Sequence, residues 1–201
     1  MATPVERAWN SIKLNDITTL KQIVPSEVDP NASIPDENCE IRYLMHAAAA
    51  FGSLECLQYL VKIGGEEGLR YATDKGYTVL HWAAYGGWED ILKYLHQKSV
   101  SLDTPEKTSQ TALHIAAARG HLGCVEFLTQ HLSMMDKTAE FKWTPLHFAI
   151  AYGQKETVTL LIKKGANTSI VDYLGRSADV LAREYKRKWW DEIDPNQQNR
   201  K

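Results

Sequence analysis

A seven-residue pattern recurs along the chain at a fixed spacing. Residues 78–84 read TVLHWAA, residues 111–117 read TALHIAA and residues 144–150 read TPLHFAI, so the copies begin 33 residues apart. A glycine follows each copy at the same offset, at Gly87, Gly120 and Gly153. A period of this length indicates a stack of small units that share a core, because one unit alone cannot bury its apolar face.

The third copy can be translated into local structure. Thr144 can cap a helix through its hydroxyl, and Pro145 suits the first helical position, where no backbone N–H is needed. Gly153 can end that helix with a positive φ, and a second helix is expected over residues 155–165. Neither helix is long enough to be stable alone. Each copy is therefore predicted to be a pair of short antiparallel helices, joined to the next copy by a hairpin loop.

These copies resemble the ankyrin repeat, with which they share the T-P-L-H-x-A signature and the 33-residue period. The resemblance covers about residues 5–190 and implies an all-α ankyrin-repeat solenoid, in which helix-turn-helix units stack and β-hairpin-like loops connect them. We expect a single domain over residues 1–193 and a disordered tail at residues 194–201. The six predicted units are residues 5–42 (the N-terminal cap), 43–77, 78–110, 111–143, 144–176 and 177–193 (the C-terminal cap).

Two segments depart from the regular period. Residues 25–42 form a long polar connection that contains three prolines, and we expect them to be an enlarged first loop. Residues 62–76 carry the two extra residues between the second and third copies, so we expect this hairpin to bulge.

Charge and composition exclude several function classes. The 201 residues carry 23 basic and 25 acidic side chains, which gives no whole-chain attraction to nucleic acid or to an anionic membrane. No apolar run approaches the roughly 18 residues of a membrane span, and the N-terminus lacks the apolar region of a signal peptide. Three widely spaced cysteines argue against a disulfide framework. We expect a monomeric protein of the cytoplasm, or of the nucleus, with no membrane partner.

Motifs for catalysis and for cofactors are missing from the sequence. It contains no G-x-S-x-G, no phosphate-binding loop and no H-E-x-x-H. Stacked helices lie roughly 8–10 Å apart, too far for histidines one repeat apart to share a zinc ion at about 2 Å from each nitrogen. The resemblance instead implies structural hydrogen bonds for the histidines in register, which are His46, His81, His114 and His147. We predict no enzyme, no cofactor and no metal site.

The basic stretch REYKRKWW at residues 183–190 leaves an alternative open. Its four cations could bind nucleic acid or a phosphate ligand, although three acidic residues follow by position 194. The other interpretation is a solvated last helix, in which Trp189 and Trp190 seal the core.

The resemblance also implies a binding surface. In ankyrin stacks, the residue before the threonine and the pair before the helix-ending glycine tend to face a partner on the concave side. Five of these thirteen positions are aromatic and three are arginine, whereas the whole chain is 9% aromatic. These residue types dominate binding hot spots. With the hairpin tips, the predicted partner-binding residues are Phe51, Tyr77, Tyr85, Gln110, Arg119, Phe141, Trp143, Tyr152, Tyr173 and Arg176.

The sequence thus predicts non-catalytic recognition of a folded protein through the concave face and the hairpin tips, as an adaptor, an inhibitor or an assembly chaperone. The alternative function is nucleic-acid or phosphate-ligand binding through the basic C-terminal helix. An alternative for the rings themselves is that they pack flat against neighbouring repeats. If Trp143 is a contact residue, Trp143→Ala should change the free energy of unfolding by less than about 1 kcal/mol.

Overall fold

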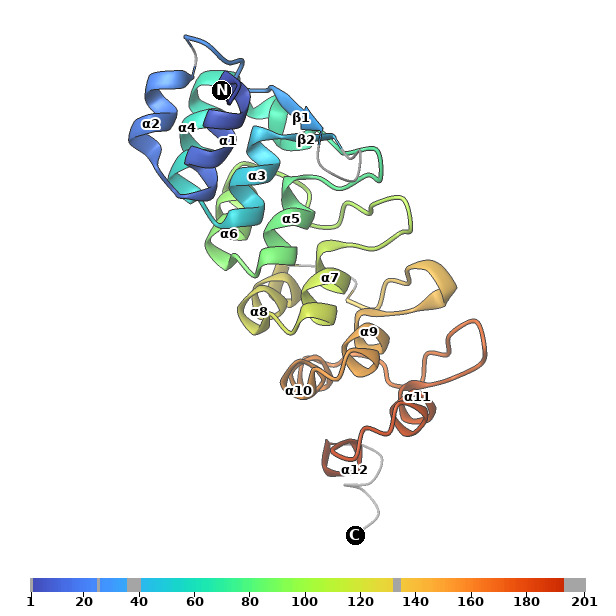
Figure 1. Cartoon of the computed structure of the whole chain (residues 1–201). Helices are drawn as coiled ribbons and strands as arrows, with labels where there is room; N and C mark the ends of the chain where they lie inside the picture. The colour runs from blue at the N-terminus through green and yellow to red at the C-terminus, as the bar shows by residue number, and fades with distance from the viewer. Residues whose placement is uncertain (1, 25, 36–40, 132–134, 194–201) are drawn as a thin grey trace. The chain divides into compact units, whose positions relative to one another are not determined.

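The computed structural model describes residues 2–24, 26–35, 41–131 and 135–193. The predicted tail at residues 194–201 lies outside this part of the chain. The chain divides into two compact units, residues 1–101 and residues 102–201, and each is described by itself. Both units are built from pairs of short helices, which Figure 1 shows with their connecting loops.

The first unit stacks its helix pairs so that α1 packs on α3 and α3 packs on α5. Behind them, α2 packs on α4. Buried leucines such as Leu20, Leu57 and Leu80 fill the space between these helices. The pairs are α1 (Pro4–Lys13) with α2 (Ile17–Ile23), α3 (Leu44–Phe51) with α4 (Leu54–Gly64), and α5 (Val79–Gly86) with α6 (Glu89–Gln97).

The second unit repeats this arrangement. Its first helices pack in the order α7, α9, α11, and α8 packs on α10. Trp190 is fully buried, which confirms its predicted place in the core, whereas Trp189 is half-buried. The pairs are α7 (Ala112–Arg119) with α8 (Leu122–His131), α9 (Pro145–Ala151) with α10 (Lys155–Lys163), and α11 (Ala178–Glu184) with α12 (Trp190–Ile193).

Three of the first helices, α5, α7 and α9, begin with the same threonine–histidine contact. The threonine N–H donates to Nδ1 of the histidine three residues later. The donor–acceptor distances are 3.1 Å for Thr78 and His81, 3.1 Å for Thr111 and His114, and 3.2 Å for Thr144 and His147. The Thr144 hydroxyl also accepts the His147 N–H, so its predicted capping role is confirmed. All three histidines are buried within the helix starts that they close.

The two irregular segments have structure of their own. Within residues 25–42, β1 (Ser33–Pro35) pairs antiparallel with β2 (Ile41–Tyr43), and Ser33 lies opposite Tyr43. The long connection therefore ends in a short β-ladder that leads directly into α3. The segment 62–76 contains the 3₁₀ helix η1 (Glu66–Arg70), which packs against α4 and α5.

The all-α class and the stacked helix-turn-helix units predicted from the sequence are confirmed. Figure 1 shows the hairpin loops before α9 and before α11 extending away from the helices of the second unit. None of the described helices has the length and apolar character that crossing a membrane would require.

Candidate functional site

Four hairpins share one backbone hydrogen bond, repeated at intervals of 33 residues. In each, the N–H at the start of the tip donates to the carbonyl oxygen four residues later. The bonds join Thr73 to Tyr77 (2.8 Å), Glu106 to Gln110 (2.9 Å), Ala139 to Trp143 (2.8 Å) and Asp172 to Arg176 (3.0 Å). Four predicted site residues, Tyr77, Gln110, Trp143 and Arg176, thus occupy equivalent positions at the bases of their hairpins.

Buried carboxylates hold two of these hairpins in shape. Glu106 accepts the N–H groups of Thr108 and Gln110, each at 2.9 Å. Asp172 accepts the equivalent pair from Leu174 and Arg176, also at 2.9 Å. Such bonds fix the loop before any ligand arrives, because a carboxylate that is 3% or 7% exposed must find its partners within the protein.

The hairpin between α8 and α9 departs from this scheme because Ala139 has no side-chain acceptor. Its tip forms the 3₁₀ helix η2 (Glu140–Lys142), in which Phe141 and Lys142 adopt φ angles of 58° and 59°. A left-handed backbone is costly for residues with a Cβ. Glycine holds the position equivalent to Lys142 in two of the other hairpins, at Gly76 and Gly175. The strained tip carries an exposed phenylalanine.

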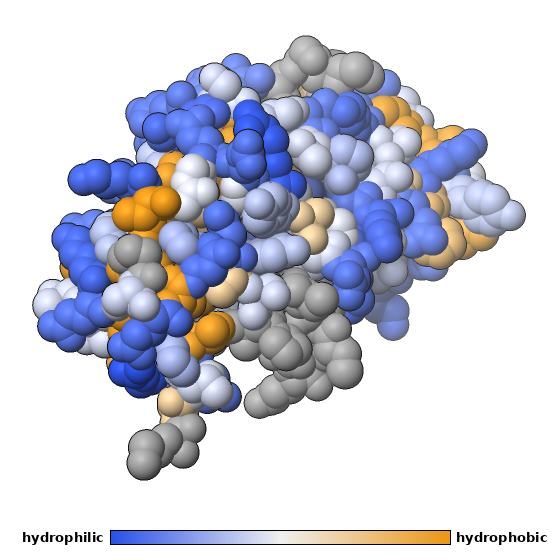
Figure 2. Space-filling view, turned by 90° about the horizontal axis from the view of Figure 1, so that it is seen from above, coloured by the Kyte–Doolittle hydropathy of each residue, from blue (hydrophilic) through white to orange (hydrophobic). Residues whose placement is uncertain are grey.

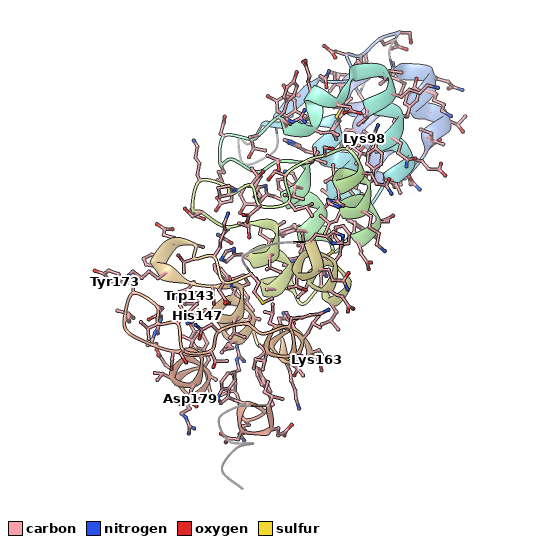
Figure 3. All side chains as sticks on the ribbon, turned by 180° about the vertical axis from the view of Figure 1, so that it is seen from behind. Lys98, Trp143, His147, Lys163, Tyr173 and Asp179 are labelled. Carbon is pink, nitrogen blue, oxygen red and sulfur yellow. The ribbon has the colours of Figure 1, made fainter. Side chains whose placement is uncertain are left out.

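Trp143 lies at the base of the strained hairpin, and it is half-buried. Its indole Nε1 donates to Asp172 Oδ2 at 3.3 Å. The edge of its ring meets Phe148 of α9, with the ring centroids 5.2 Å apart and the planes at 81°. Figure 3 shows Trp143 next to His147, close to the helices, and Tyr173 at the outer end of the next hairpin. Trp143 thus packs against its own unit and also borders the surface.

A cavity of about 360 Å³ opens beside Trp143. Its lining comes from three neighbouring parts of the second unit: the hairpin before α7, η2 with its flanking residue, and α9. The lining residues are Gln110, Glu140, Phe141, Trp143 and Phe148. Three of them were predicted from the sequence, whereas Glu140 and Phe148 were not. Phe148 occupies the variable position of the T-P-L-H-x-A signature, and nothing in the sequence indicated that its ring borders a cavity.

Three predicted aromatic residues of the second unit are exposed. Phe141 is 65% exposed, Tyr152 at the end of α9 is 63% exposed and Tyr173 is 72% exposed. The Tyr173 N–H donates to the Phe141 carbonyl oxygen at 2.9 Å, so two adjacent hairpins are joined at their tips. The structure therefore brings Phe141 and Tyr173 together on one edge of this unit.

The two predicted arginines of the second unit differ in their surroundings. Arg176 binds Asp172 at 2.7 Å and Glu184 at 2.9 Å, and its side chain is only 17% exposed. Its guanidinium therefore stabilises the last hairpin and has little capacity left for a partner. Arg119, at the end of α7, is exposed.

The predicted residues of the first unit belong to two clusters of rings. Tyr77 and Tyr85 both contact Trp82, with ring centroids 5.5 Å and 5.8 Å apart, and Tyr85 is 42% exposed. Phe51 is half-buried and meets Trp9 edge to face at 5.9 Å. These rings pack on one another, as the alternative for the aromatic positions proposed, and also border the surface.

The buried histidines at the starts of α7 and α9, His114 and His147, are uncharged at neutral pH. Burial lowers the pKa of His114 to about 4 and also lowers the pKa of His147. Burial by itself would raise the pKa of Asp172, but hydrogen bonds from Arg176 outweigh it and keep that pKa below its usual value. The unit therefore keeps a neutral imidazole and a charged carboxylate beside Trp143.

The described residues offer little for catalysis or metal binding. No group of three His, Cys, Asp or Glu side chains in this part of the chain is placed to hold a metal ion. Burial, with the nearby charges of Glu55 and Asp16, raises the pKa of the Cys56 thiol to about 11, so it is not a thiolate nucleophile at neutral pH.

The comparisons with known proteins agree with the fold. A model described as ankyrin repeats (3 copies) matches residues 9–106 and 90–172. The chain belongs to the ankyrin repeat family. Members of this family are in general non-catalytic modules for protein–protein interaction.

Individual ankyrin proteins match only part of the chain. It is 42% identical over 55 residues to the Notch-regulated ankyrin repeat-containing protein of Xenopus tropicalis, and 40% identical over 55 residues to that of Homo sapiens. Each match covers 27% of this chain and 46% of the relative. Protein B of Danio rerio is 41% identical over 51 residues, which are 25% of this chain and 44% of the relative. The matched region is therefore less than half the length of these relatives.

Proposed function

We propose that this ankyrin repeat protein binds a folded protein partner, without catalysis, through the aromatic edge of its second unit. We define this aromatic edge as Phe141, Tyr152 and Tyr173 together with the cavity beside Trp143. The observation that carries the proposal is the exposure of three large rings in a unit whose hairpins are held by buried carboxylates. An adaptor, an inhibitor and an assembly chaperone would all use such a surface.

Preorganisation of the hairpins supports this proposal. Buried carboxylates hold the loops on either side of η2, and the bond from Tyr173 to Phe141 joins two tips. Binding to a loop that is already ordered costs less conformational entropy than binding to a flexible one. Aromatic side chains on such loops have few rotatable bonds, so each ring adds contact area at low entropic cost.

Exposed rings are also uncommon on a surface that has no partner. Figure 2 shows a face on which hydrophilic residues predominate and apolar residues are confined to patches. Gathered apolar side chains on a monomeric protein typically mark an interaction site. We extend the proposal to Tyr85 of the first unit as a second contact region, and Arg119 is an additional contact on the second unit.

The basic C-terminal segment gives less support to the alternative partner, nucleic acid. Arg183 pairs with Asp179 at 3.1 Å, and Arg187 donates to the Ile150 carbonyl oxygen at 2.9 Å. One of its four cations is therefore paired with a carboxylate, and a second has its guanidinium bonded to the end of α9, which leaves fewer charged groups free to contact phosphates.

The similarity to Notch-regulated relatives names no partner for this chain. It covers 27% of the chain, and its length is that of one or two repeats. We therefore infer from these relatives only that the chain contains the same kind of repeat, and the identity of the partner must come from experiment.

The test is a paired affinity capture from a cell lysate, read by mass spectrometry. The bait variant Phe141→Ala/Tyr152→Ala/Tyr173→Ala removes exposed rings only, so its folding should match the wild type. The control variant Leu14→Ala/Leu122→Ala removes exposed apolar side chains elsewhere, which are 78% and 41% exposed. We expect a protein that the wild type and the control capture and the ring variant loses. Identical captures by all three baits would overturn the proposal.

A further inference from the structure

The cavity beside Trp143 is lined by three aromatic residues and one acidic residue. Phe141, Trp143 and Phe148 supply the rings, and Glu140 supplies the charge. Trp143 and Phe148 meet edge to face at 81°, so their faces point in different directions. Rings arranged in this way present more than one negative π-face to whatever enters between them.

The carboxylate of Glu140 is available to a ligand. Within the described part of the chain, no cation forms an ion pair with it. The nearby cations Lys137 and Arg176 are paired with Asp103 and Asp172 instead. Lys142 is exposed but does not line the cavity.

The wall behind Phe148 adds no positive charge. The His114 ring meets Phe148 edge to face, with centroids 5.6 Å apart, and this imidazole is buried and neutral at pH 7. A cation in the cavity would therefore meet a carboxylate and π-faces, with no repulsion from the imidazole behind them.

We propose that this cavity receives the side-chain ammonium group of a lysine on the partner protein and that it favours the methylated form. The inference rests on the proposed function, because the lysine belongs to the protein that the aromatic edge binds. Methyl groups spread the positive charge and reduce its hydration, so a methylated ammonium group loses less on leaving water and gains from contact with ring faces. Glu140 supplies the opposite charge at the rim.

The size of the cavity fits one side chain. A volume of about 360 Å³ is near the lower end of small-molecule sites, which span roughly 300–1,000 Å³. A compact head group on a flexible stem can enter such a space while the partner's backbone stays outside. The amide nitrogen of Gln110, a lining residue, already donates to the Thr108 hydroxyl at 2.9 Å, which leaves the amide oxygen to accept a backbone N–H of the partner.

The experiment uses the full chain and short peptides with a single lysine, either unmodified or trimethylated. A third peptide carries a tert-butyl group in place of trimethylammonium and so keeps the shape without the charge. Binding is followed through the indole N–H resonance of Trp143, which is assigned with Trp143→Phe. We expect the trimethylated peptide to bind more tightly than the neutral isostere by about two- to thirtyfold in Kd.

Variants locate the effect in the cavity. Glu140→Gln and Phe141→Ala should each weaken binding of the trimethylated peptide by about two- to thirtyfold. Leu122→Ala is the matched control, because Leu122 is an exposed apolar residue at the start of α8 that neither lines the cavity nor belongs to the aromatic edge. It should leave peptide binding unchanged.

Several results would overturn the inference. Equal binding of the neutral isostere would show a purely apolar pocket, and choline binding as tightly as the peptide would identify a free quaternary amine as the ligand. A lack of any shift at millimolar peptide would show that the cavity takes no ammonium group. If the capture experiment finds a protein that the wild type binds and the ring variant does not, these results exclude the lysine site but leave the proposed function in place.

Discussion

The Nε2 atom of His114 lies 3.2 Å from the carbonyl oxygen of Trp143. Its Nδ1 accepts the N–H of Thr111 at 3.1 Å, so the ring proton resides on Nε2 and is donated to the carbonyl. The Lys137 carbonyl oxygen, at 3.0 Å, receives the same proton. One buried imidazole therefore closes a helix start and also fixes both ends of the hairpin that carries Phe141.

Replacing His114 should loosen the aromatic edge from within. His114→Ala removes the polar contacts of a fully buried ring with Thr111, Lys137 and Trp143, and the Trp143 carbonyl oxygen keeps only the Ala139 N–H as its donor. We expect the free energy of unfolding to fall by about 2 kcal/mol or more. Urea denaturation measures this loss, and the exposed His96→Ala provides the control. Equal stability of the two variants would contradict the structural role of His114.

The stability of the protein should fall in mild acid. The folded pKa of His114, about 4, is below the unfolded value of 6.5, so between these pH values the unfolded chain binds a proton that the folded chain does not. The contribution of the neutral, buried His114 to the free energy of unfolding is therefore complete above pH 6.5. It falls by about 3 kcal/mol as the pH is lowered towards 4. His147 acts in the same direction because burial also lowers its pKa.

Urea denaturation at pH values between 7.5 and 4.5 measures this dependence. The variant His114→Asn keeps a polar side chain and removes the titrating group, so its stability should change less with pH than that of the wild type. Parallel curves for the two proteins would show that His114 is not responsible.

The hydrogen bond from Trp143 to Asp172 changes what is expected of Trp143→Ala. From the sequence, an exposed contact residue should lose less than about 1 kcal/mol. The ring is instead half-buried against Phe148, and its indole nitrogen is paired with a buried carboxylate at 3.3 Å. We now expect a loss of about 2 kcal/mol for Trp143→Ala and about 1 kcal/mol for Trp143→Phe, which keeps an aromatic ring. Thermal and urea unfolding of both variants test this order.

A carboxylate at position 139 should stabilise the strained hairpin. Ala139→Asp would supply the acceptor that Glu106 and Asp172 provide in the adjacent hairpins. We expect a gain of about 1 kcal/mol in the free energy of unfolding. Gly175→Ala is the opposite test, because its φ of 75° is unfavourable for alanine, and it should cost about 1 kcal/mol. A loss of stability in Ala139→Asp would show that the tip of η2 does not resemble the other hairpins.

Much of the fold could be predicted from the sequence because its determinants are local. The threonine, the histidine three residues later and the glycine that follows specify where α5, α7 and α9 begin and end. The β1–β2 pair could not be predicted, since the polar, proline-rich segment 25–42 carries no alternating apolar pattern. The sequence placed Phe141, Tyr152 and Tyr173 on loops and helix ends, where side chains are commonly exposed.

Other features of the site depend on contacts between repeats. Arg176 reads as a surface cation, but its pairing with Glu184 of the next helix becomes visible only in the structure. In the sequence, Phe148 is simply one residue of a predicted helix. The structure shows that the hairpin before this helix places Trp143 against its ring. Glu140 has no motif at all. Its importance comes from the cavity that it shares with three aromatic residues.

Photo-crosslinking tests the central claim most directly, namely that the aromatic edge of the second unit contacts a protein partner. A photoreactive phenylalanine analogue is placed at position 141 in one sample and at position 14, which is also highly exposed, in another. After irradiation in a lysate, we predict a discrete crosslinked protein from position 141 that is absent from position 14. The same crosslinked products from both positions, or a discrete product from position 14 alone, would contradict this account of the protein.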